Sequence, residues 1–576
     1  MLFTSFNASV GGRWQALMPR WMPYSAILIG TLFFSASLTP SLIPRTYMVE
    51  GILSGLSFSF GFAIGMLCHR LWEYMRFPKL AEPQLSIIRA SIIVTCAASA
   101  MAFLWLATDW QNSLREFMNV ERVSRSYSFL ILLVAAITVV GTFGIASIFL
   151  LVFRRAQSAL ARVLPRRVSR VIGLAVAIIV FGGVANGVLF RVAFHLLDSS
   201  FREYDSLIEA GIPRPTSSFR TGSAASGLIW DELGRAGREF VGSGPTAAEI
   251  SLLTAKKALE PIRVYVGLRA AETVDQRVDL AVEELKRMKA FDRSTLVIAT
   301  PTGTGWVDPA AIDSAEYLAN GDIATVAVQY SYFSSPLSLL IEPQLGADTA
   351  TSLFKEVYKY WTNLPKGKRP RLLVYGLSLG SLNSEKSIEL FDILSDPING
   401  ALWSGPPFEN QLWRSITKSR QPGSPAWLPQ YSDGSVVRFM NQRGSAVAAG
   451  SPWGAMRIVY LQYASDPVTF FDYADLYREP DWMVAPRGPD VSPDFQWYPV
   501  ITLLQLGFDM ALATTTPIGF GHVYAPDHYV DAWVAVAAPP GWTDEQVAKL
   551  KQHLDQEMVH DLARPGEANP YEARGG

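Results

Sequence analysis

Five long apolar runs occupy the first third of this 576-residue chain and constrain its fold more than any other feature. A helix needs about 20 apolar residues to cross a hydrocarbon core of roughly 30 Å, and each run reaches that length. The first run starts only after Trp21 and is followed by others, which is not typical of a cleavable signal peptide. The sequence therefore predicts an α-helical membrane domain of about five spans in residues 1–197, at 24–44, 49–72, 86–107, 127–153 and 168–190.

The distribution of positive charge between the runs predicts an orientation. The N-terminal segment and the connectors on its side, such as Arg154-Arg155, carry more Lys and Arg than the opposite connectors. Positively charged loops remain in the cytoplasm, so the N-terminus is expected there. With five spans, everything after residue 195 lies on the far side. In a bacterium this is an inner (cytoplasmic) membrane protein with a periplasmic or otherwise extracytoplasmic C-terminal domain.

The apolar runs themselves look like an anchor. Few ionisable residues lie inside them, which favours anchoring over transport. Gly51-x-x-x-Gly55 and Gly61-x-x-x-Gly65 predict closely packed helices.

Composition excludes several functional classes. The 50 basic and 51 acidic residues give a net charge of -1, without the basic excess typical of nucleic-acid binders. Both cysteines, Cys68 and Cys96, lie in the apolar runs, so the rest of the chain can form no disulfide or Cys-ligated metal site. The six histidines include no H-E-x-x-H pair. We expect no nucleic-acid partner, no metal and no cofactor.

The second half of the chain has the pattern of an α/β domain. Residues 198–260 are polar and are interpreted as a linker with a lead-in helix, and residues 261–576 form the next domain. Helical patterns at 274–289 and 347–362 alternate with short β-branched runs, which predicts a mainly parallel sheet. The expected strands are 262–268, 295–300, 324–330, 371–375, 400–403 and 457–463.

Ser378 is the candidate nucleophile. It is the serine of a G-x-S-x-G motif, Gly376 to Gly380, which follows an apolar strand and precedes a helical pattern at 381–394. The glycines allow a sharp strand-to-helix turn that lifts the serine hydroxyl clear of the sheet. The alternative is a serine that only caps a helix.

Asp466 is the candidate acid that orients the base. It follows the apolar run at 457–463 and precedes Pro467, the expected place for an acid after a later strand. Its role would be to hold the tautomer of a histidine and stabilise the imidazolium. Asp472 and Asp475 are weaker alternatives, and an Asp-Pro turn without catalytic meaning is the other.

His522 is the candidate base. It lies in a glycine-rich loop at 517–524, a context that presents a side chain into a site. Its rival, His528 in Pro-Asp-His, resembles the start of a helix. The order Ser378, Asp466, His522 is the order that a G-x-S-x-G hydrolase requires.

Two backbone segments are expected to form an oxyanion hole. The N–H of Leu379 follows the nucleophile, and a second N–H should come from Gly303, Thr304 or Gly305, in the loop after the strand at 295–300. A phosphate-binding loop is the poorer reading, because no G-x-x-x-x-G-K-[ST] occurs. Residues 404–456 lack a clear αβ rhythm and are rich in Pro and Trp, which fits a lid or acyl pocket as well as a rigid surface excursion.

Several of these motifs together resemble the bacterial α/β-hydrolase 9 family, in which a multi-span membrane domain precedes an α/β-hydrolase domain. They include Pro-Thr-Gly-Thr-Gly-Trp, Gly-Leu-Ser-Leu-Gly, Tyr-Ala-Ser-Asp-Pro and Gly-His-Val-Tyr. The resemblance covers nearly all of 228–537, at 230–245, 261–268, 301–309, 329–332, 376–380, 400–407, 460–467 and 521–524.

The resemblance implies an α/β-hydrolase fold and supports Ser378, Asp466 and His522 as a triad. The chain departs from the family pattern in two places. It has Leu377 where the family often has an acidic residue, and Phe520 where the family tends to have the first histidine of Gly-His-Gly-His. His522 is the histidine that remains.

These features together predict an integral membrane serine hydrolase of the esterase or lipase type. The membrane location makes a lipid or cell-envelope glycan acyl ester the expected substrate. Two alternatives remain: an acyltransferase with the same triad, and a catalytically silent scaffold or transport accessory. Neither the natural substrate nor the oligomeric state follows from the sequence.

Overall fold

The computed structural model describes residues 23–77, 82–184, 205–206, 211–445, 447 and 450–562. The chain divides into two compact units. The helical unit comprises residues 1–193, 472–480 and 492–509, and the sheet unit comprises residues 194–471, 481–491 and 510–576. The three-part division expected from the sequence, at 197 and 260, remains a prediction.

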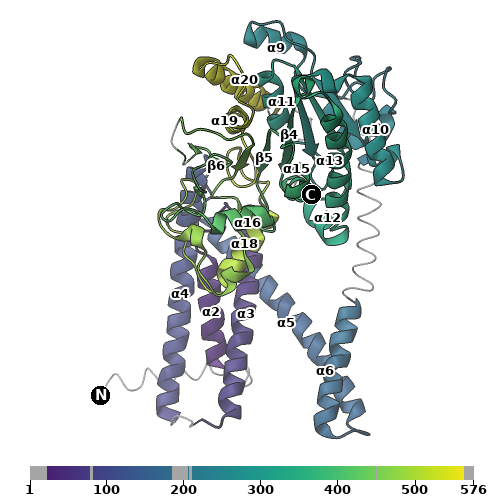
Figure 1. The fold of residues 1–576 in the computed structure, drawn as a ribbon. Coiled ribbons are helices and arrows are strands. Elements are labelled where there is room, and N and C mark those ends of the chain that lie inside the picture. Colours follow the sequence, from purple (N-terminus) through teal and green to yellow (C-terminus); the bar gives the residue numbers. More distant parts are fainter. Residues whose placement is uncertain are drawn as a thin grey trace. The chain divides into compact units, whose positions relative to one another are not determined.

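The helical unit is built from long apolar helices, shown in purple and blue in Figure 1. They are α2 (Tyr24–Ser37), α3 (Tyr47–Tyr74), α4 (Glu82–Phe117), α5 (Ser126–Leu160) and α6 (Arg166–Gly183), joined by most of α18 (Ile501–Ala511) from late in the chain. Within the described residues, α3, α4 and α5 are long and apolar enough to cross a membrane, whereas α2 has only 14 residues.

The expected count of about five spans remains a prediction. The end of the fifth apolar run, at 185–190, lies outside the described residues. The same holds for several of the positive charges counted for the orientation: Arg13, Arg20 and Lys79 on the N-terminal side, and Arg191 and Arg202 on the opposite side.

Glycines in α3 bring its backbone close to two neighbouring helices. A Cβ atom on Gly65 would lie 2.4 Å from the Cα of Ala26 in α2, and one on Gly55 would lie 2.7 Å from the carbonyl oxygen of Ala135 in α5. Gly61 and Gly51 face the same two helices. Real Cβ atoms do not approach backbone so closely, so the two small-residue motifs do pack helices, as the sequence predicts.

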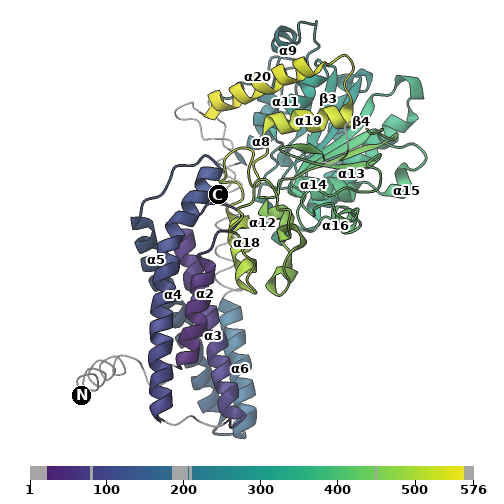
Figure 2. The same cartoon turned by 90° about the vertical axis from the view of Figure 1, so that its left-hand side faces the viewer.

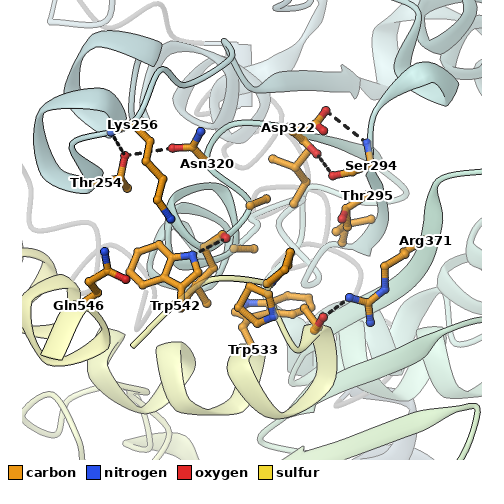
Figure 3. A pocket seen from close by; sticks show the side chains of 18 of the residues that line it. Thr254, Lys256, Ser294, Thr295, Asn320, Asp322, Arg371, Trp533, Trp542 and Gln546 are labelled. Carbon is orange, nitrogen blue, oxygen red and sulfur yellow. Dashed lines mark hydrogen bonds between the residues drawn. The ribbon is translucent and has the colours of Figure 1, made fainter. Parts of the chain in front are cut away.

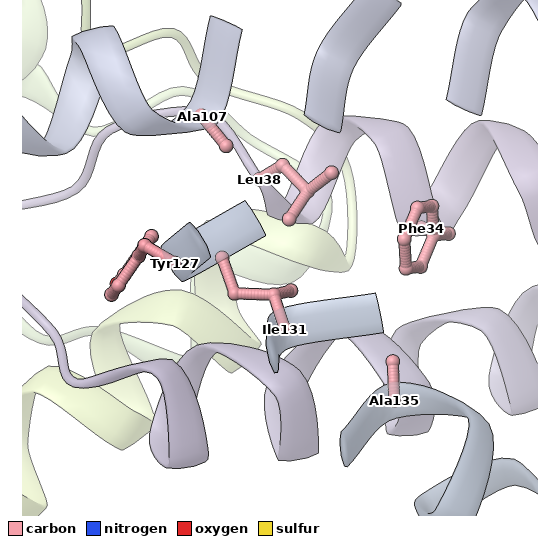
Figure 4. Close-up of a cluster of buried hydrophobic side chains, with 6 residues drawn as sticks. All are labelled: Phe34, Leu38, Ala107, Tyr127, Ile131 and Ala135. Atoms are coloured by element: carbon pink, nitrogen blue, oxygen red, sulfur yellow. The ribbon is translucent and has the colours of Figure 1, made fainter. Parts of the chain in front are cut away.

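An apolar cluster joins α2, α4 and α5 (Figure 4). Ile131 of α5 is fully buried there, against Phe34 and Leu38 from the α2 end and Ala107 of α4. Tyr127, at the edge of the cluster, donates its hydroxyl hydrogen to the carbonyl of Arg45 at 2.8 Å. The cluster therefore borders a buried polar group.

Arg45, which supplies this carbonyl, lies in the loop between α2 and α3. Arg45 is fully buried, and its Nε donates to Asp509 at 2.8 Å while its Nη1 donates to Glu50 at 3.0 Å. Gln505 donates to the carbonyl of Thr39 at 3.0 Å. Asp509 and Gln505 belong to α18, so a helix from the C-terminal half of the chain completes the helical unit.

The sheet unit contains an eight-stranded sheet in the order β1-β3-β2-β4-β5-β8-β6-β7. All neighbours are parallel except the pair β6 and β7, which confirms the predicted mainly parallel sheet. The strands are β1 (Ile262–Val266), β2 (Thr295–Thr300), β3 (Ile323–Val328), β4 (Arg371–Leu377), β5 (Gly400–Ser404), β6 (Val437–Asn441), β7 (Gly444–Ser445) and β8 (Arg457–Leu461).

Helices cover both faces of the sheet (Figures 1 and 2). On one face lie α10 (Val274–Arg287), α13 (Leu345–Asn363) and α14 (Leu379–Ser387), and on the other lie α11 (Pro309–Leu318) and α19 (Pro526–Ala537), with α20 (Asp544–Leu562) packed on α19. Parallel strands place their carboxyl ends at one edge, and the loops after β2, β4, β5 and β8 meet there.

Two local expectations differ from the structure. Residues 404–456 contain a strand of the central sheet, β6, which pairs in parallel with β8. The alternation in Val437–Asn441 is too short to stand out among the surrounding Pro and Trp residues. The helix expected at 381–394 is two helices, because the extended backbone of Ile388 separates α14 from α15 (Leu390–Ile393).

Candidate active site

Ser378 occupies a strained turn between β4 and α14. Its φ of 56° and ψ of -128° are rare for a residue with a side chain. A Cβ on Gly376 would lie 2.4 Å from the carbonyl carbon of Gly380, and one on Gly380 would lie 2.3 Å from the carbonyl oxygen of Thr300. Only glycines fit at both positions, so the G-x-S-x-G motif is what lets the chain turn here.

His522 and Asp466 form a buried pair. His522 Nδ1 lies 2.7 Å from Asp466 Oδ2, and the two residues are 7% and 0% exposed. The other carboxylate oxygen accepts the N–H of Val468 at 2.9 Å, which caps the short helix α17 (Pro467–Phe470). Asp466 therefore both caps a helix in an Asp-Pro turn and accepts from a histidine. The backbone N–H of His522 donates to the carbonyl of Ala513 at 3.0 Å.

The second ring nitrogen of His522, Nε2, does not face Asp466. Nε2 is buried and has no hydrogen-bond partner within the described residues, so the Ser378 hydroxyl is not bonded to it here. Backbone contacts bring the two neighbourhoods together. The Ser378 N–H donates to the carbonyl of Ser404 at 3.0 Å, and a Cβ on the next residue, Gly405, would lie 2.6 Å from His522 Cε1.

The rival residues serve local structure. His528 lies in the first turn of α19, as its sequence context indicates, and its Nδ1 is 2.6 Å from the Tyr463 hydroxyl. Burial lowers the pKa of His528, so its neutral form is favoured. Asp472 caps the helical turn η6 (Tyr473–Leu476), and Asp475 accepts the N–H of Asp472 at 3.0 Å.

The expected oxyanion donors differ in their availability. Leu379 is the first residue of α14, where a backbone N–H has no acceptor inside the helix. The N–H groups of Gly303 and Gly305 donate to Ser335 at 3.2 Å and to Thr302 at 3.0 Å. Of the three residues 303–305, only Thr304 has an N–H without an acceptor among the described residues.

Two residues of this region escaped sequence reasoning. Tyr524 donates its hydroxyl hydrogen to Asp466 Oδ2 at 2.9 Å, the oxygen that also faces His522. Gly405 has a φ of 48° and leaves room for the His522 ring. The available signals were a tyrosine two residues after His522 and a glycine directly after β5, and both patterns are common in loops.

A cavity of about 450 Å³ lies at the opposite edge of the sheet (Figure 3). Thr295, Ile323 and Arg371, at the amino ends of their strands, line it together with Trp533 and Trp542. It therefore contains none of the candidate catalytic residues, which follow the carboxyl ends. The described residues include no group of three or more His, Cys, Asp or Glu side chains that could hold a metal ion.

Comparison with known families covers both units. Residues 262–550 match the alpha/beta-hydrolase family model, and residues 38–245 match the model of the alpha/beta-hydrolase family N-terminus. No match was found among curated proteins or among solved structures.

Proposed function

This chain belongs to the alpha/beta-hydrolase family, and we propose that it is an integral membrane serine hydrolase that cleaves acyl esters. The observation that carries the proposal is the arrangement at the carboxyl edge of the sheet. A serine in a strained turn, a buried His–Asp pair 2.7 Å apart and an unpartnered imidazole nitrogen are the parts that an activated serine requires.

In the first half of the proposed reaction, the Ser378 hydroxyl oxygen attacks the ester carbonyl carbon and passes its proton to His522 Nε2. Asp466 accepts the Nδ1–H and stabilises the imidazolium that forms. The developing oxyanion is stabilised by the N–H of Leu379 and by one N–H of the loop 303–305. His522 then protonates the leaving alcohol, and an acyl ester of Ser378 remains.

The second half repeats these steps with water. His522 Nε2 takes a proton from the water as its oxygen attacks the acyl carbon. The tetrahedral intermediate collapses, the proton returns to Ser378, and the carboxylic acid leaves. Tyr524 supports both halves, because its hydroxyl bond to Asp466 limits how that carboxylate can turn away from His522.

The proposed substrate and location rest on the helical unit. Among the described residues, three apolar helices are long enough to span a membrane, which supports a site that works beside lipid. We therefore propose a lipid or envelope-glycan acyl ester as substrate, in a bacterial inner membrane with the sheet unit on the periplasmic side.

The test is covalent labelling by a fluorophosphonate probe in native membranes. Wild type should react at one serine. Ser378→Ala should abolish labelling, and His522→Ala and Asp466→Asn should slow it about 10⁴-fold, because the serine then lacks its base or the base lacks its orientation. His528→Gln is the matched control: it changes a histidine six residues away and should leave labelling intact.

Three results would contradict the proposal. They are labelling that survives Ser378→Ala, His528→Gln abolishing labelling while His522→Ala does not, and an unlabelled but folded wild-type protein, as a silent scaffold would give. An ester that disappears only when an acceptor alcohol is added would reassign the site to acyl transfer.

A further inference from the structure

We propose that Asp490 and Ser465 are positioning residues that fix the loop carrying His522; this role rests on the proposed function. Ser465 directly precedes Asp466, and Gly521 directly precedes His522. The N–H of Gly521 donates to the Ser465 hydroxyl oxygen at 2.9 Å. The base and its acid are therefore joined twice, once through their side chains and once through their chain neighbours.

Asp490 sets the direction of this second link. Its Oδ2 accepts the Ser465 hydroxyl hydrogen at 2.7 Å and the Ser465 N–H at 2.9 Å. A serine hydroxyl has one hydrogen, so committing it to Asp490 leaves only lone pairs to face Gly521. The chain of bonds runs from Gly521 through Ser465 to a carboxylate, which only accepts, and a charged acceptor strengthens each bond.

The same carboxylate is also linked to the histidine loop two residues earlier, at Gly519. Gln442 donates from Nε2 to Asp490 Oδ2 at 2.9 Å and to the carbonyl of Gly519 at 3.2 Å. The loop is thus fixed at Gly519 and at Gly521, on one side of His522, by groups that converge on one oxygen. Gln442 follows β6, the strand that sequence reasoning missed.

Packing alone does not account for Asp490. It is 2% exposed, its described donors are all uncharged, and its Oδ1 is buried without a partner among the described residues. Burying a carboxylate in this way costs free energy that a neutral side chain of the same shape would not. Holding the base in register with Ser378 is the advantage that offsets this cost, because small displacements of a catalytic group slow a reaction strongly.

The test compares Asp490→Asn, Ser465→Ala and their double variant with wild type in steady-state hydrolysis of a p-nitrophenyl ester and in fluorophosphonate labelling of the full-length protein. Each single variant should lower kcat about 10- to 100-fold with KM unchanged, because neither residue touches the substrate. The double variant should lose less than the product of the two single losses, because Asp490 acts partly through Ser465 and partly through Gln442. Asp494→Asn makes the same chemical change at an exposed aspartate four residues later in the chain and should behave as wild type.

Four outcomes overturn the role: full kcat in folded Asp490→Asn and Ser465→Ala, losses that multiply in the double variant, a rise in KM in place of the fall in kcat, or an equal loss in Asp494→Asn. If Asp490→Asn does not fold, Ser465→Ala decides alone, because it only removes a buried oxygen, and full kcat there overturns the role. An unlabelled wild type overturns the proposed function first, whereas a labelled wild type with unaffected variants overturns only this positioning role.

Discussion

Among the described residues, each unit contains one arginine that is fully buried and paired with carboxylates, and the two ion pairs are built differently. Arg263 of β1, in the sheet unit, donates hydrogen bonds to both carboxylate oxygens of Glu316, from Nε at 2.8 Å and from Nη2 at 2.8 Å. It also donates to the carbonyl of Phe240 at 2.7 Å. Asp313, one helical turn before Glu316, is also bonded to it. Both acids lie in α11, about 50 residues after the arginine.

Arg45 of the helical unit donates to one carboxylate oxygen of each of two acids, and these acids are far apart in the chain. Glu50 is five residues away, whereas Asp509 is 464 residues away. Asp509 also accepts the N–H of Leu42 at 3.0 Å through its other oxygen. The ion pairs of Arg263 join residues of one contiguous αβ segment. The ion pairs of Arg45 also need a residue from the C-terminal half of the chain.

The difference shows that the N-terminal apolar helices are not complete without a later part of the chain. A buried arginine without its partner is strongly destabilising, since the uncompensated charge remains out of water. The helical unit therefore depends on α18, and α18 continues directly into the segment that leads to Ala513, the acceptor of the His522 backbone N–H.

Removing the helices should have the largest effect. A fragment of residues 198–576 lacks Arg45, so α18 loses the partners of Asp509 and Gln505, and we expect no folded protein and no probe labelling. Co-expression of residues 1–197 should restore part of the labelling. A fragment that is soluble, folded and labelled at the wild-type rate would show that the two regions are independent.

Asp509→Ala should be the most damaging of the single substitutions considered for the buried pairs. It leaves Arg45 with one carboxylate and Leu42 without its acceptor, and we expect a loss of about 3–5 kcal/mol in the free energy of unfolding in detergent. The control Asp494→Asn should change little. Replacing all three members, Arg45→Met with Asp509→Leu and Glu50→Gln, should recover part of the loss, because no unpaired charge then stays buried. If the triple variant is the less stable one, the charge argument is wrong.

Glu316→Gln in the sheet unit should cost less, about 1–3 kcal/mol. Arg263 keeps Asp313, the Phe240 carbonyl and one amide oxygen in place of the carboxylate. The measurement compares the temperature at which probe labelling is lost with the temperature at which helicity is lost by circular dichroism. Glu316→Gln should lower the first temperature more than the second, because the labelled serine lies in the sheet unit. An effect as large as that of Asp509→Ala would remove the contrast between the two arginines.

The fold of the sheet unit could be predicted well from the sequence because its signals are local. Six runs of β-branched residues correspond to β1, β2, β3, β4, β5 and β8, and glycines at 376 and 380 meet backbone atoms as a sharp turn requires. The pairing of Asp466 with His522 was anticipated from chain order after a strand, and the structure places their side chains 2.7 Å apart. Their catalytic role remains a prediction.

What the sequence could not predict depends on contacts between distant segments. The place of α18 in the helical unit rests on Asp509 and Gln505, which look like ordinary polar residues of an 11-residue helix. The Asp490–Ser465 link and Gly405 beside His522 have no local pattern either. Such contacts form only when folding brings distant segments together, and the periodicity of the sequence does not encode them.

The smallest effect on stability is expected at Asp475. This residue is a buried carboxylate whose described contacts include no arginine. It is 2% exposed, accepts the N–H of Asp472 at 3.0 Å, and burial raises its pKa to about 7. A carboxyl group that binds its proton more tightly when folded stabilises the protein at low pH, and this contribution is lost as pH rises from about 4 through about 7. Asp475→Asn, which cannot ionise, removes that dependence.

The measurement is the difference in unfolding temperature between Asp475→Asn and wild type from pH 4.5 to 8, because the difference cancels the other titrating groups. Asp475→Asn should become progressively more stable relative to wild type up to about pH 7 and level off above it. The exposed Asp494→Asn should give a flat difference. A flat difference for Asp475→Asn as well would mean that this carboxylate ionises without cost, and a buried acid in the helical unit would then not need an arginine such as Arg45.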